Sequence, residues 1–434
     1  MKVVFLNVES NKKVYRDYNG GYGTSFHAGK SFLGRVLTYM RTHKENFPYM
    51  PYAYGATILH QRGHDVSIET NTLPDADLVI LHASMPNHSH EIKYLKELKE
   101  KGTNIGIIGP FASIKPELFE DASFIAMSEP ESIIMDIANK GTIPKGRVYC
   151  PPIENLDELP YPDWSLFPLN EYSYSPIINK KPFTFVLGSR GCSYGCNYCP
   201  YISESNNGRR FRKRSVNNIV GELKYLKEKF GVKGVQFRDP IFTLDMKRIE
   251  ELCKAIIKEG IDMELGCETR ADRLNEDLLN LMYKAGFRII KLGIESASPE
   301  VLRKSKRLPI ELEHQEYIIK HCDKIGMKVV GFYIIGLEND THESVKSTIS
   351  YAKLLNTDFA NFTVCTPIPG TEFYEIVKDK IFTENYDMFD NFHPTFHHNN
   401  LSTKDIVKYQ EKAFISYYLR LGYIYKYFKN KLRR

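Results

Sequence analysis

Short apolar runs alternate with helix-like segments over the first third of the chain. The apolar runs predict buried strands at residues 3–7, 64–68, 77–82, 104–109 and 122–127. Apolar residues that recur every three or four positions predict helices at residues 54–62, 89–101 and 130–138. Buried strands separated by helices indicate a doubly wound parallel sheet, which binds ligands at the carboxyl ends of its strands. We therefore expect a Rossmann-like α/β domain over residues 1–140.

A second alternation of strands and helices begins near residue 183. Six strands are predicted at residues 183–187, 234–238, 262–267, 289–294, 328–335 and 359–364. Helices are predicted between and after them at residues 218–230, 245–259, 276–285, 299–304, 314–324 and 342–355. Six strand–helix units favour a partial (β/α)6 barrel of the TIM type, with its active site at the strand carboxyl ends. We assign residues 182–378 to this domain.

Three segments do not follow this alternation. Residues 19–50 are rich in glycine and aromatic residues, and we interpret them as an insertion that is either a surface loop or a flap over a ligand. Residues 141–181 are rich in proline and tyrosine and are predicted to be an ordered linker. Residues 379–434 end in a basic, aromatic helical region. That helix either packs on the barrel or contacts a membrane surface or an acidic partner.

Composition narrows the class of protein. The 434 residues carry a net charge of +6, but residues 404–434 alone hold nine Lys or Arg against two Asp or Glu. The remainder is close to neutral, so nucleic acid is not an expected partner. No apolar run is long enough for a transmembrane span, and the N-terminus reads as a strand rather than a signal peptide. Eight cysteines without an export signal favour a reducing, cytoplasmic location.

Three of the eight cysteines lie close together at Cys192, Cys196 and Cys199, directly after the first strand of the second domain. Three thiolates on one short loop can hold three irons of a [4Fe–4S] cluster and leave the fourth iron open. A structural zinc site needs a fourth ligand, which only a distant residue can supply here. Unliganded thiols are the third reading of this loop.

The C-x3-C-x2-C spacing, with aromatic Tyr198 before the last cysteine, resembles the radical S-adenosylmethionine (SAM) superfamily. The resemblance implies that SAM chelates the open iron and receives an electron from the reduced cluster. Cleavage of a carbon–sulfur bond then gives a 5′-deoxyadenosyl radical that abstracts a hydrogen atom. It also implies an external low-potential electron donor of the flavodoxin or ferredoxin type. Tyr198 is expected among the cofactor-binding residues.

The ends of the second and third barrel strands carry charged residues with expected roles toward SAM. Asp239 follows the second strand, where the family places a carboxylate for the SAM amino group. Glu268 and Arg270 close the third strand and are separated by one residue. By the resemblance, they hold a ribose hydroxyl and the SAM carboxylate, respectively. The alternative is a structural ion pair at the rim of the barrel.

Three further strand ends match the same superfamily. Gly293 to Ser296 resembles its Gly-Ile-Glu-Ser turn, so Glu295 and Ser296 are candidates for polar contacts with SAM. The fifth strand resembles the one that approaches the adenine, with Ile335 as the expected contact. Residues 366–371 resemble the Pro-x-Pro-Gly-Thr turn of the sixth strand.

The N-terminal half resembles the cobalamin-binding domain that precedes many such barrels. The Asp-x-His-x-x-Gly signature, whose histidine ligates cobalt in other cobalamin proteins, is absent. The usual glycine-rich turns are also altered at residues 108–112 and 128–131. Cobalamin is then expected to rest against the backbone at Ser84, Gly109 and Ser128. The alternative is a Rossmann-like domain that has lost its ligand.

Together the two halves predict a cobalamin-dependent radical SAM enzyme. The reaction expected from this combination is transfer of a methyl group to an unactivated carbon. The alternative is a radical cyclisation or rearrangement in which cobalamin is absent or donates no methyl group, and a non-catalytic iron–sulfur carrier is disfavoured. The expected substrate is a small molecule or a lipid-type compound, and the basic aromatic tail suggests association with a membrane surface.

Overall fold

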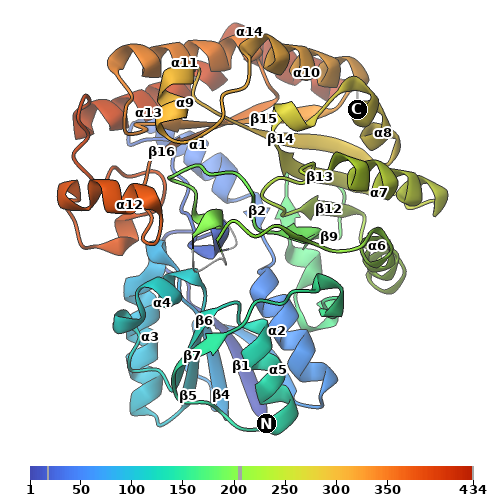
Figure 1. Ribbon diagram of the computed structural model, residues 1–434, viewed down its shortest axis with the longest axis vertical. Helices are drawn as coiled ribbons and strands as arrows, with labels where there is room; N and C mark the ends of the chain where they lie inside the picture. The colour runs from blue at the N-terminus through green and yellow to red at the C-terminus, as the bar shows by residue number, and fades with distance from the viewer. Residues whose placement is uncertain (17–18, 204–207, 433–434) are drawn as a thin grey trace.

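The computed structural model describes residues 1–16, 19–203 and 208–432, which form two α/β units, one above the other in Figure 1. The first unit contains a sheet of six parallel strands in the order β3-β1-β4-β5-β6-β7. These strands are β1 (Lys2–Asn7), β3 (Asp65–Thr70), β4 (Leu78–His82), β5 (Asn104–Ile108), β6 (Phe124–Ser128) and β7 (Gly146–Cys150). The strand order reverses between β1 and β4, which makes their carboxyl ends the switch point where such sheets bind ligands.

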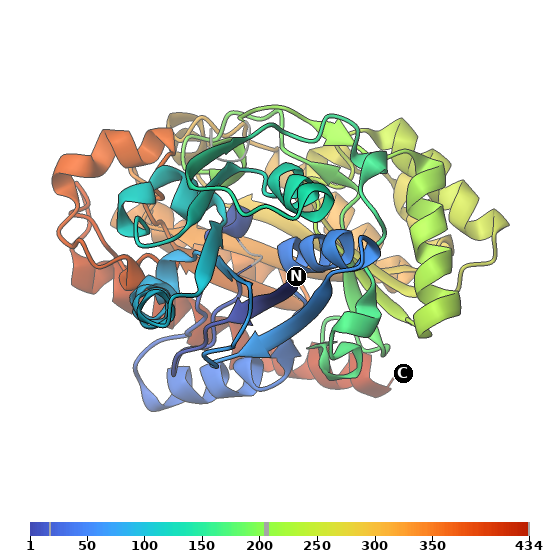
Figure 2. The same cartoon turned by 90° about the horizontal axis from the view of Figure 1, so that it is seen from below.

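Both faces of this first sheet are buried, as the prediction of a doubly wound sheet requires. In β1, Val3 and Phe5 belong to one hydrophobic cluster, whereas Val4 and Leu6 belong to another. Successive side chains of a strand point to opposite faces, so helices must cover both sides. Figure 2 shows the sheet between its helices. The helices are α2 (Met50–Gln61) and α5 (Glu131–Lys140) on the first face, and α3 (His88–Glu100) and α4 (Pro110–Ile114) on the second.

The second unit contains six parallel strands that follow one another in chain order across the sheet. The strands are β9 (Phe183–Val186), β12 (Gly234–Phe237), β13 (Glu264–Thr269), β14 (Phe287–Glu295), β15 (Lys328–Ile335) and β16 (Phe359–Val364). The helices are α6 (Val216–Phe230), α7 (Met246–Lys258), α8 (Glu276–Lys284), α9 (Pro299–Lys304), α10 (Leu312–Ile325), α11 (His342–Leu355) and α12 (Glu372–Val377). All six predicted strand–helix units are present.

This second sheet is open in its hydrogen bonding. β9 and β16 lie at its two edges and do not pair with each other. The parallel α/β architecture is therefore confirmed, while the partial-barrel curvature stays a prediction. Because every strand runs in the same direction, the segments that follow the strands gather at one edge, where the candidate residues were expected.

Several elements lie in segments where the sequence analysis expected no regular structure. β7 extends the first sheet as far as Cys150, inside the predicted linker, so the domain boundary at residue 140 falls short of this strand. Helix α1 (Phe32–Thr42) lies inside the predicted insertion. That insertion is also tied to the linker by an antiparallel pair, β2 (Glu45–Asn46) with β8 (Ser173–Tyr174).

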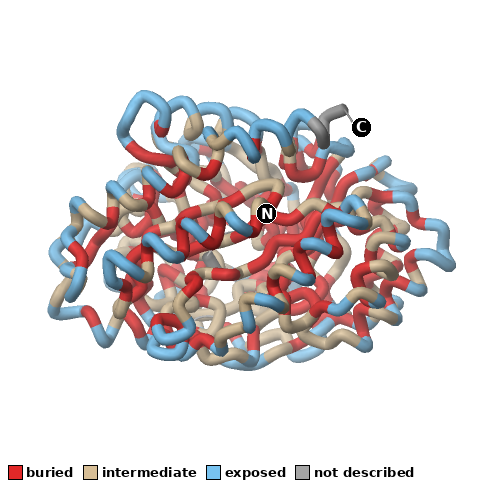
Figure 3. The backbone as a smooth tube through the Cα atoms, turned by 90° about the horizontal axis from the view of Figure 1, so that it is seen from above, coloured by how far each residue is buried: buried red, intermediate tan, exposed pale blue. Residues whose placement is uncertain are grey.

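The C-terminal region is helical, as expected. Helix α13 (Thr403–Tyr418) packs against β16, and its Tyr418 hydroxyl donates a hydrogen bond to the Ala360 carbonyl at 2.7 Å. Helix α14 (Leu421–Leu432) buries Tyr423 but exposes other aromatic side chains. Figure 3 shows the exposed positions on the outer helices and the buried ones toward the centre. Every helix in the described part of the chain is too short or too polar to cross a bilayer.

Candidate functional site

The cysteine loop is held between two short antiparallel strands, β10 (Ser189–Arg190) and β11 (Arg212–Lys213). Cys192 and Cys196 are buried, and Cys199 is partly buried. Burial raises the pKa of the Cys199 thiol, and negative charge on Cys196 and Cys192 raises it further. The three thiols therefore share one site, and three thiolates there require compensating positive charge such as bound iron.

The spacing of these thiols discriminates between a cluster and a single ion. Among the residues that the structure describes, the one set of three His, Cys, Asp or Glu ligand atoms within 4.8 Å of one another is His27, Asp390 and His393. The three cysteine sulfurs are therefore too far apart to bind one mononuclear ion together. In a [4Fe–4S] cube each thiolate binds a different corner iron, so separated sulfurs fit. The residues present match an iron–sulfur cluster better than zinc.

Backbone contacts fix the shape of this loop. Gly191 has a φ of +80°, and a Cβ atom there would lie 1.8 Å from the Arg210 carbonyl oxygen. Only glycine avoids that clash, so the residue before Cys192 packs directly against the backbone of Arg210. Further along, the Asn197 amide donates to the Ser305 carbonyl at 3.1 Å. The loop is thus fastened to the segment after α9.

Arg307 lies beside the cysteine loop, and the sequence analysis did not identify it. Its Nη1 atom is 3.9 Å from the Cys196 sulfur, and its Nη2 atom is 3.5 Å from Glu295 Oε1. The same guanidinium also donates a hydrogen bond to the Gly293 carbonyl. Burial raises the pKa of Glu295, and the charge of Arg307 opposes that increase. Arg307 is 108 positions from Cys199 and belongs to no recognisable motif, so only the fold reveals this contact.

Glu295 and Arg270 retain features expected of SAM contacts. Glu295 has a φ of 66° and ends β14 at the edge where the cysteine loop lies. Arg270 binds Asp272 through Nε at 2.9 Å and Nη2 at 3.2 Å, and its guanidinium lies over the Tyr194 ring. Its Nη1 atom is buried without a hydrogen-bond partner in the described chain. That orphaned donor fits the predicted role of holding a carboxylate.

Glu268 and Arg270 do not pair with each other. Glu268 instead binds Arg238 and the Nζ atom of Lys291, the latter at 3.0 Å. Burial alone would raise the pKa of Glu268, but the two cations outweigh it and lower that pKa. Burial also lowers the pKa of Lys291 to about 8, against the opposing effect of Glu268. The structure therefore does not show the alternative, an ion pair between Glu268 and Arg270 at the rim. A ribose contact by Glu268 stays a prediction.

Asp239 and Ser296 make contacts that occupy their side chains. Asp239 is fully buried and accepts hydrogen bonds from the Ser189 hydroxyl and, at 2.8 Å, from the Gly188 amide. It thus braces the strand that leads into the cysteine loop. The Ser296 hydroxyl accepts from the Ser298 amide at 3.1 Å and so stabilises the start of α9. The structure assigns both residues a supporting role around the loop, and direct contact with SAM remains a prediction.

The remaining two candidates are apolar or aromatic. Ile335 ends β15 with its side chain fully buried, and its carbonyl accepts from the Cys365 amide at 2.9 Å. The Tyr198 hydroxyl is buried and has no hydrogen-bond partner among the described residues. Both lie at the strand edge where cofactor contacts were expected, but neither shows a contact that assigns it a ligand.

A cavity that is partly open to solvent lies between the two units. Gly109 and Ser128, at the ends of β5 and β6, line it from the first unit, and Gly191 of the cysteine loop lines it from the second. Gly20 and Gly21 of the insertion also line it, which favours the flap interpretation of that segment. The structure thus brings the carboxyl ends of the first sheet and the cysteine loop to one pocket.

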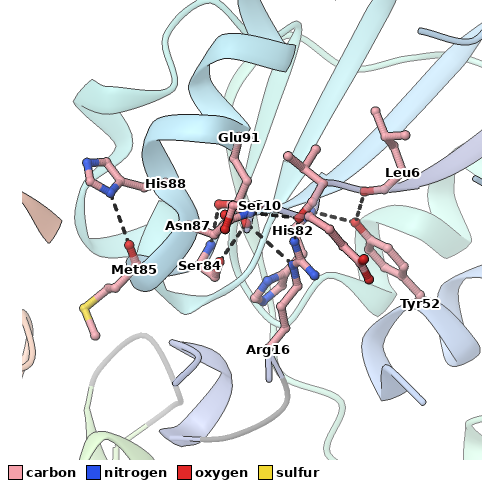
Figure 4. A network of polar contacts seen from close by, with 12 residues as sticks. Leu6, Ser10, Arg16, Tyr52, His82, Ser84, Met85, Asn87, His88 and Glu91 are labelled. Atoms are coloured by element: carbon pink, nitrogen blue, oxygen red, sulfur yellow. Dashed lines mark hydrogen bonds and ion pairs between the residues drawn. The ribbon is translucent and has the colours of Figure 1, made fainter. Parts of the chain in front are cut away.

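Ser84 does not share this pocket. Its hydroxyl donates to Glu91 Oε1 at 2.6 Å and its amide donates to Oε2 at 2.8 Å. Glu91 in turn lies 3.5 Å from Arg16, in the buried polar network of Figure 4. Both polar groups of Ser84 are therefore already occupied, so of the three predicted backbone contacts, Gly109 and Ser128 are the ones that face the cavity.

His82 was not among the predicted site residues, although it ends β4 and lines the cavity. Its side chain is buried, and its two ring nitrogens have no hydrogen-bond partner in the described chain. Burial and the nearby Arg16 hold the pKa of His82 well below its usual range, so the ring is neutral. The sequence could not single out His82, because a histidine within a run of buried strand residues looks the same whether it packs in the core or binds a ligand.

Ion pairs fasten the two units around the cavity. Arg190 of β10 lies 2.6 Å from Glu131 and 3.2 Å from Glu129. Arg212 of β11 also binds Glu129. Burial alone would raise the pKa of Glu129, but the two guanidiniums outweigh it and hold the pKa at about 2. These pairs join the turn after β6 to the strands that carry the cysteine loop.

The comparisons with known proteins agree with this arrangement. Residues 186–352 match the family model described as the radical SAM superfamily. An uncharacterized methyltransferase of Pyrococcus horikoshii is 34% identical over 272 residues, or 62% of this chain and 58% of the relative. An anaerobic magnesium-protoporphyrin IX monomethyl ester cyclase of Rubrivivax gelatinosus is 26% identical, over 67% of this chain and 52% of the relative. The chain thus spans little more than half the length of these relatives.

Solved structures show the same fold across both units. TsrM is a radical SAM methyltransferase of Kitasatospora setae that was solved with cobalamin and a [4Fe–4S] cluster. It superposes with a TM-score of 0.61 at 15% identity, and the match covers 87% of this chain and 78% of TsrM. OxsB, a cobalamin-dependent radical SAM enzyme, superposes with a TM-score of 0.67 at 14% identity, covering 95% and 66%. The family match and the cysteine loop together identify a radical SAM domain over residues 186–352, and the two solved structures show that the fold of both units is shared.

Proposed function

We propose that this protein is a cobalamin-dependent radical SAM enzyme that methylates an unactivated carbon. The observation that carries the proposal is the cavity between the two units. It is lined by the carboxyl ends of the first sheet at Gly109 and Ser128, and by Gly191 beside the first cysteine. A ligand bound there therefore touches the strand carboxyl ends of one sheet and the cysteine loop of the other. Methylation by this class of enzyme needs both cofactors within reach of one substrate.

The proposed roles of the chain's own residues follow from their contacts. Cys192, Cys196 and Cys199 hold the cluster, Arg307 stabilises its negative charge, and Arg270 offers its orphaned Nη1 donor to the SAM carboxylate. A bound cluster supplies the electron that cleaves SAM, and bound methylcobalamin supplies the methyl group. The buried walls around the loop keep water away from a radical.

The proposed cobalamin site lacks the usual sequence motifs. It keeps a glycine in the turn after β5, where the ligand would contact the protein backbone. Gly109 has a φ of +110°, and a Cβ atom there would lie 3.1 Å from the Ala83 carbonyl oxygen. Only glycine fits this position of the turn after β5, which lines the cavity. Two neighbours of this fold, TsrM and OxsB, were solved with a cobalamin bound, which supports the same ligand here.

A radical cyclisation is the second candidate, because the cyclase of Rubrivivax gelatinosus matches a larger share of this chain than the Pyrococcus methyltransferase does. The two reactions leave different products from SAM. A methylating enzyme uses SAM both as radical source and as methyl donor, so it forms 5′-deoxyadenosine and S-adenosylhomocysteine. A cyclase that transfers no methyl group forms only 5′-deoxyadenosine.

Product analysis therefore tests the proposal. We expect the anaerobically reconstituted protein, given SAM, cobalamin and a strong reductant, to form both products. The variant with Cys192, Cys196 and Cys199 changed to Ala should form no 5′-deoxyadenosine. Formation of 5′-deoxyadenosine alone, with no S-adenosylhomocysteine in the presence of cobalamin, would overturn methyl transfer and favour the cyclase reading.

The electron donor and the substrate class are part of the same proposal. We propose that a low-potential flavodoxin or ferredoxin reduces the cluster and that the substrate is a small molecule of lipid type. The support for a lipid-type substrate comes from the exposed side chains of two helices. Helix α1 exposes large apolar side chains spaced along one face, at Phe32, Leu33, Val36, Tyr39 and Met40. Helix α14 does the same at Leu421, Ile424, Tyr425 and Phe428.

These two helices are placed to act together. Both contact α13, and Figure 2 shows them along the same side of the molecule. A groove between Lys30 and α13 is lined by the basic residues Lys404, Lys408 and Lys412. Apolar faces flanked by cations are complementary to an anionic membrane surface. We therefore propose that this side of the protein rests on a membrane, from which a lipid-type substrate would be taken.

A further inference from the structure

The histidine at the end of β4 is a buried polar residue whose side chain has no hydrogen bond within the described chain. His82 is 2% exposed, and neither Nδ1 nor Nε2 has a hydrogen-bond partner in the part of the chain that the structure describes. Its one ring neighbour of note is Tyr49, packed edge-on with the ring centroids 4.6 Å apart. A buried polar group without a partner costs on the order of 1–3 kcal/mol. Such a group requires an explanation, and a missing ligand is one.

The polar groups nearest to His82 are engaged elsewhere. Arg16 donates to the Val8 carbonyl and pairs with Glu91 (Figure 4). The Tyr52 hydroxyl accepts from the backbone amide of His82 at 2.9 Å and donates to the Leu6 carbonyl at 2.8 Å. These groups therefore have partners other than the imidazole, which leaves its nitrogens available to something that the described chain does not supply.

His82 also borders the cavity. A Cβ atom at Gly109 would lie 2.5 Å from His82 Nε2, so the ring edge that carries Nε2 rests on the bare backbone of that glycine. His82, Gly109 and Ser128 line the same interdomain cavity, and Gly191 borders it on the opposite side. The imidazole thus lies at the switch point of the first sheet, on the wall that faces the cysteine loop.

We infer that His82 is a protein ligand to the cobalt of a corrinoid bound in this cavity. Imidazole is the commonest metal ligand among side chains, and it requires a ring nitrogen that is free of other partners. A corrinoid also carries peripheral amide carbonyls, so one molecule can satisfy both ring nitrogens. The chain lacks the Asp-x-His-x-x-Gly histidine, and β4 supplies one from a different position. This inference rests on the proposed cobalamin dependence and specifies how the chain holds that cofactor.

Electron paramagnetic resonance of the loaded protein tests this inference without an activity assay. The full chain is produced with 15N-histidine, loaded with natural-abundance hydroxocobalamin and reduced to the Co(II) state. A coordinated 15N nucleus splits each cobalt hyperfine line into a doublet, whereas the cofactor's own 14N base splits it into a triplet. We expect the doublet in the wild-type protein and its loss in His82→Ala.

Matched controls separate the possible results. His88→Ala, which changes a histidine that pairs with Asp387 at 2.8 Å, should keep the doublet. Because the chain has 13 histidines, loss of the doublet in His82→Ala alone assigns the ligand. Added imidazole should restore a 14N triplet in that variant.

Two outcomes overturn the inference, and only one of them also overturns the proposed cobalamin dependence. Wild-type protein that binds corrinoid, as its absorbance shows, but gives a triplet or no nitrogen splitting removes His82 as a ligand and leaves cobalamin dependence intact. Wild-type protein that binds no corrinoid removes both this inference and the cobalamin part of the proposed function. If His82→Ala fails to fold, a wild-type spectrum without a doublet still overturns the inference, and His82→Asn replaces His82→Ala for assigning the ligand.

Discussion

At the cysteine loop, the positive charge of Arg307 acts on the cluster in addition to the three cysteine ligands. The Arg307 guanidinium lies 3.9 Å from the Cys196 sulfur and is buried with it. A positive charge at that distance stabilises the more negative, reduced form of a cluster. Since Coulomb's law gives about 4 kcal/mol for two charges 4 Å apart at an effective dielectric of about 20, the effect is large enough to measure.

We therefore predict that Arg307→Met lowers the reduction potential of the cluster, by on the order of 100 mV on this Coulomb estimate. Glu295 partly neutralises the guanidinium at 3.5 Å, so the estimate is an upper value. A spectroscopic redox titration of the reconstituted protein measures the shift. Arg307→Lys, which keeps the charge, is the control and should move the potential much less. An unchanged potential in Arg307→Met would show that this residue has only a packing role.

The sequence predicted those site residues whose role depends only on their near neighbours along the chain. The three cysteines fall within eight positions, so spacing alone identified them. Arg307 lies near the cysteines only because the chain folds back toward the loop after α9. No local sequence pattern identifies this residue. Asp239 carries the expected carboxylate, but spacing could not reveal that Gly188 and Ser189 already occupy its oxygens.

At the scale of elements, the β10–β11 pair determines whether the cysteine loop can form. A side chain at position 191 would collide with the backbone oxygen of Arg210. We predict that Gly191→Ala loses most of its iron on reconstitution, as measured by iron content and the visible absorbance of the cluster.

The control for this change is Gly231→Ala. Gly231 also has a positive φ, +62°, but a Cβ atom there meets nothing within 4 Å. It carries the strain of the left-handed conformation, about 1 kcal/mol, without the collision. Equal iron loss in both variants would mean that general destabilisation, rather than loop geometry, is responsible.

The ion pairs between the turn after β6 and the β10–β11 pair give a pH-dependent contribution to stability. The pKa of Glu129 is about 2 in the folded protein, well below the usual value of about 4.3 for glutamate. A lowered pKa stabilises the fold at pH values above the unfolded-state pKa, and this contribution is lost as pH falls from about 4.5 toward 2. Its size is on the order of 2–3 kcal/mol.

We predict that Glu129→Gln lowers the free energy of unfolding by that amount at pH 7, measured by urea denaturation. The difference between wild type and variant should shrink as pH is lowered from 4.5 toward 3. A difference that stays constant over this range would show that Glu129 does not act through its charge. Glu154→Gln provides the comparison, because its pair with Arg210 is exposed and should contribute little.

Elements were predictable where their burial is periodic. β1 is covered on both faces, so its apolar run was recognised, whereas β7 is an edge strand whose residues are mostly exposed. Edge position removes the hydrophobic pattern that prediction depends on. Helix α1 escaped recognition for a related reason, because its large apolar residues face outward rather than into the core.

At the scale of the whole molecule, the outward-facing residues of α1 and α14 suggest a membrane-facing side. We predict that the wild-type chain sediments with vesicles containing anionic lipid and that the double variant Val36→Glu, Tyr425→Glu does not. Binding should weaken as salt is raised, because the basic groove contributes electrostatically. A matched change on another surface, Tyr149→Glu on exposed β7, should leave sedimentation unchanged. Equal sedimentation of wild type and double variant would contradict a membrane role for these helices.

The overall fold was the most predictable level, because two runs of alternating strands and helices specify two parallel sheets. The way the sheets face each other was not predictable, since it depends on pairs such as Arg190 with Glu131 that join residues 59 positions apart. That arrangement creates the cavity between the units, and the proposed function depends on it.

Metal analysis after anaerobic reconstitution with iron, sulfide and hydroxocobalamin tests the central claim most directly. We predict one [4Fe–4S] cluster and one cobalt per chain in the wild-type protein. The variant with all three loop cysteines changed to Ala should lose the iron and keep the cobalt, because the two cofactors contact different walls of the cavity. Iron without cobalt in the wild-type protein, or iron retained in the cysteine variant, would contradict the account.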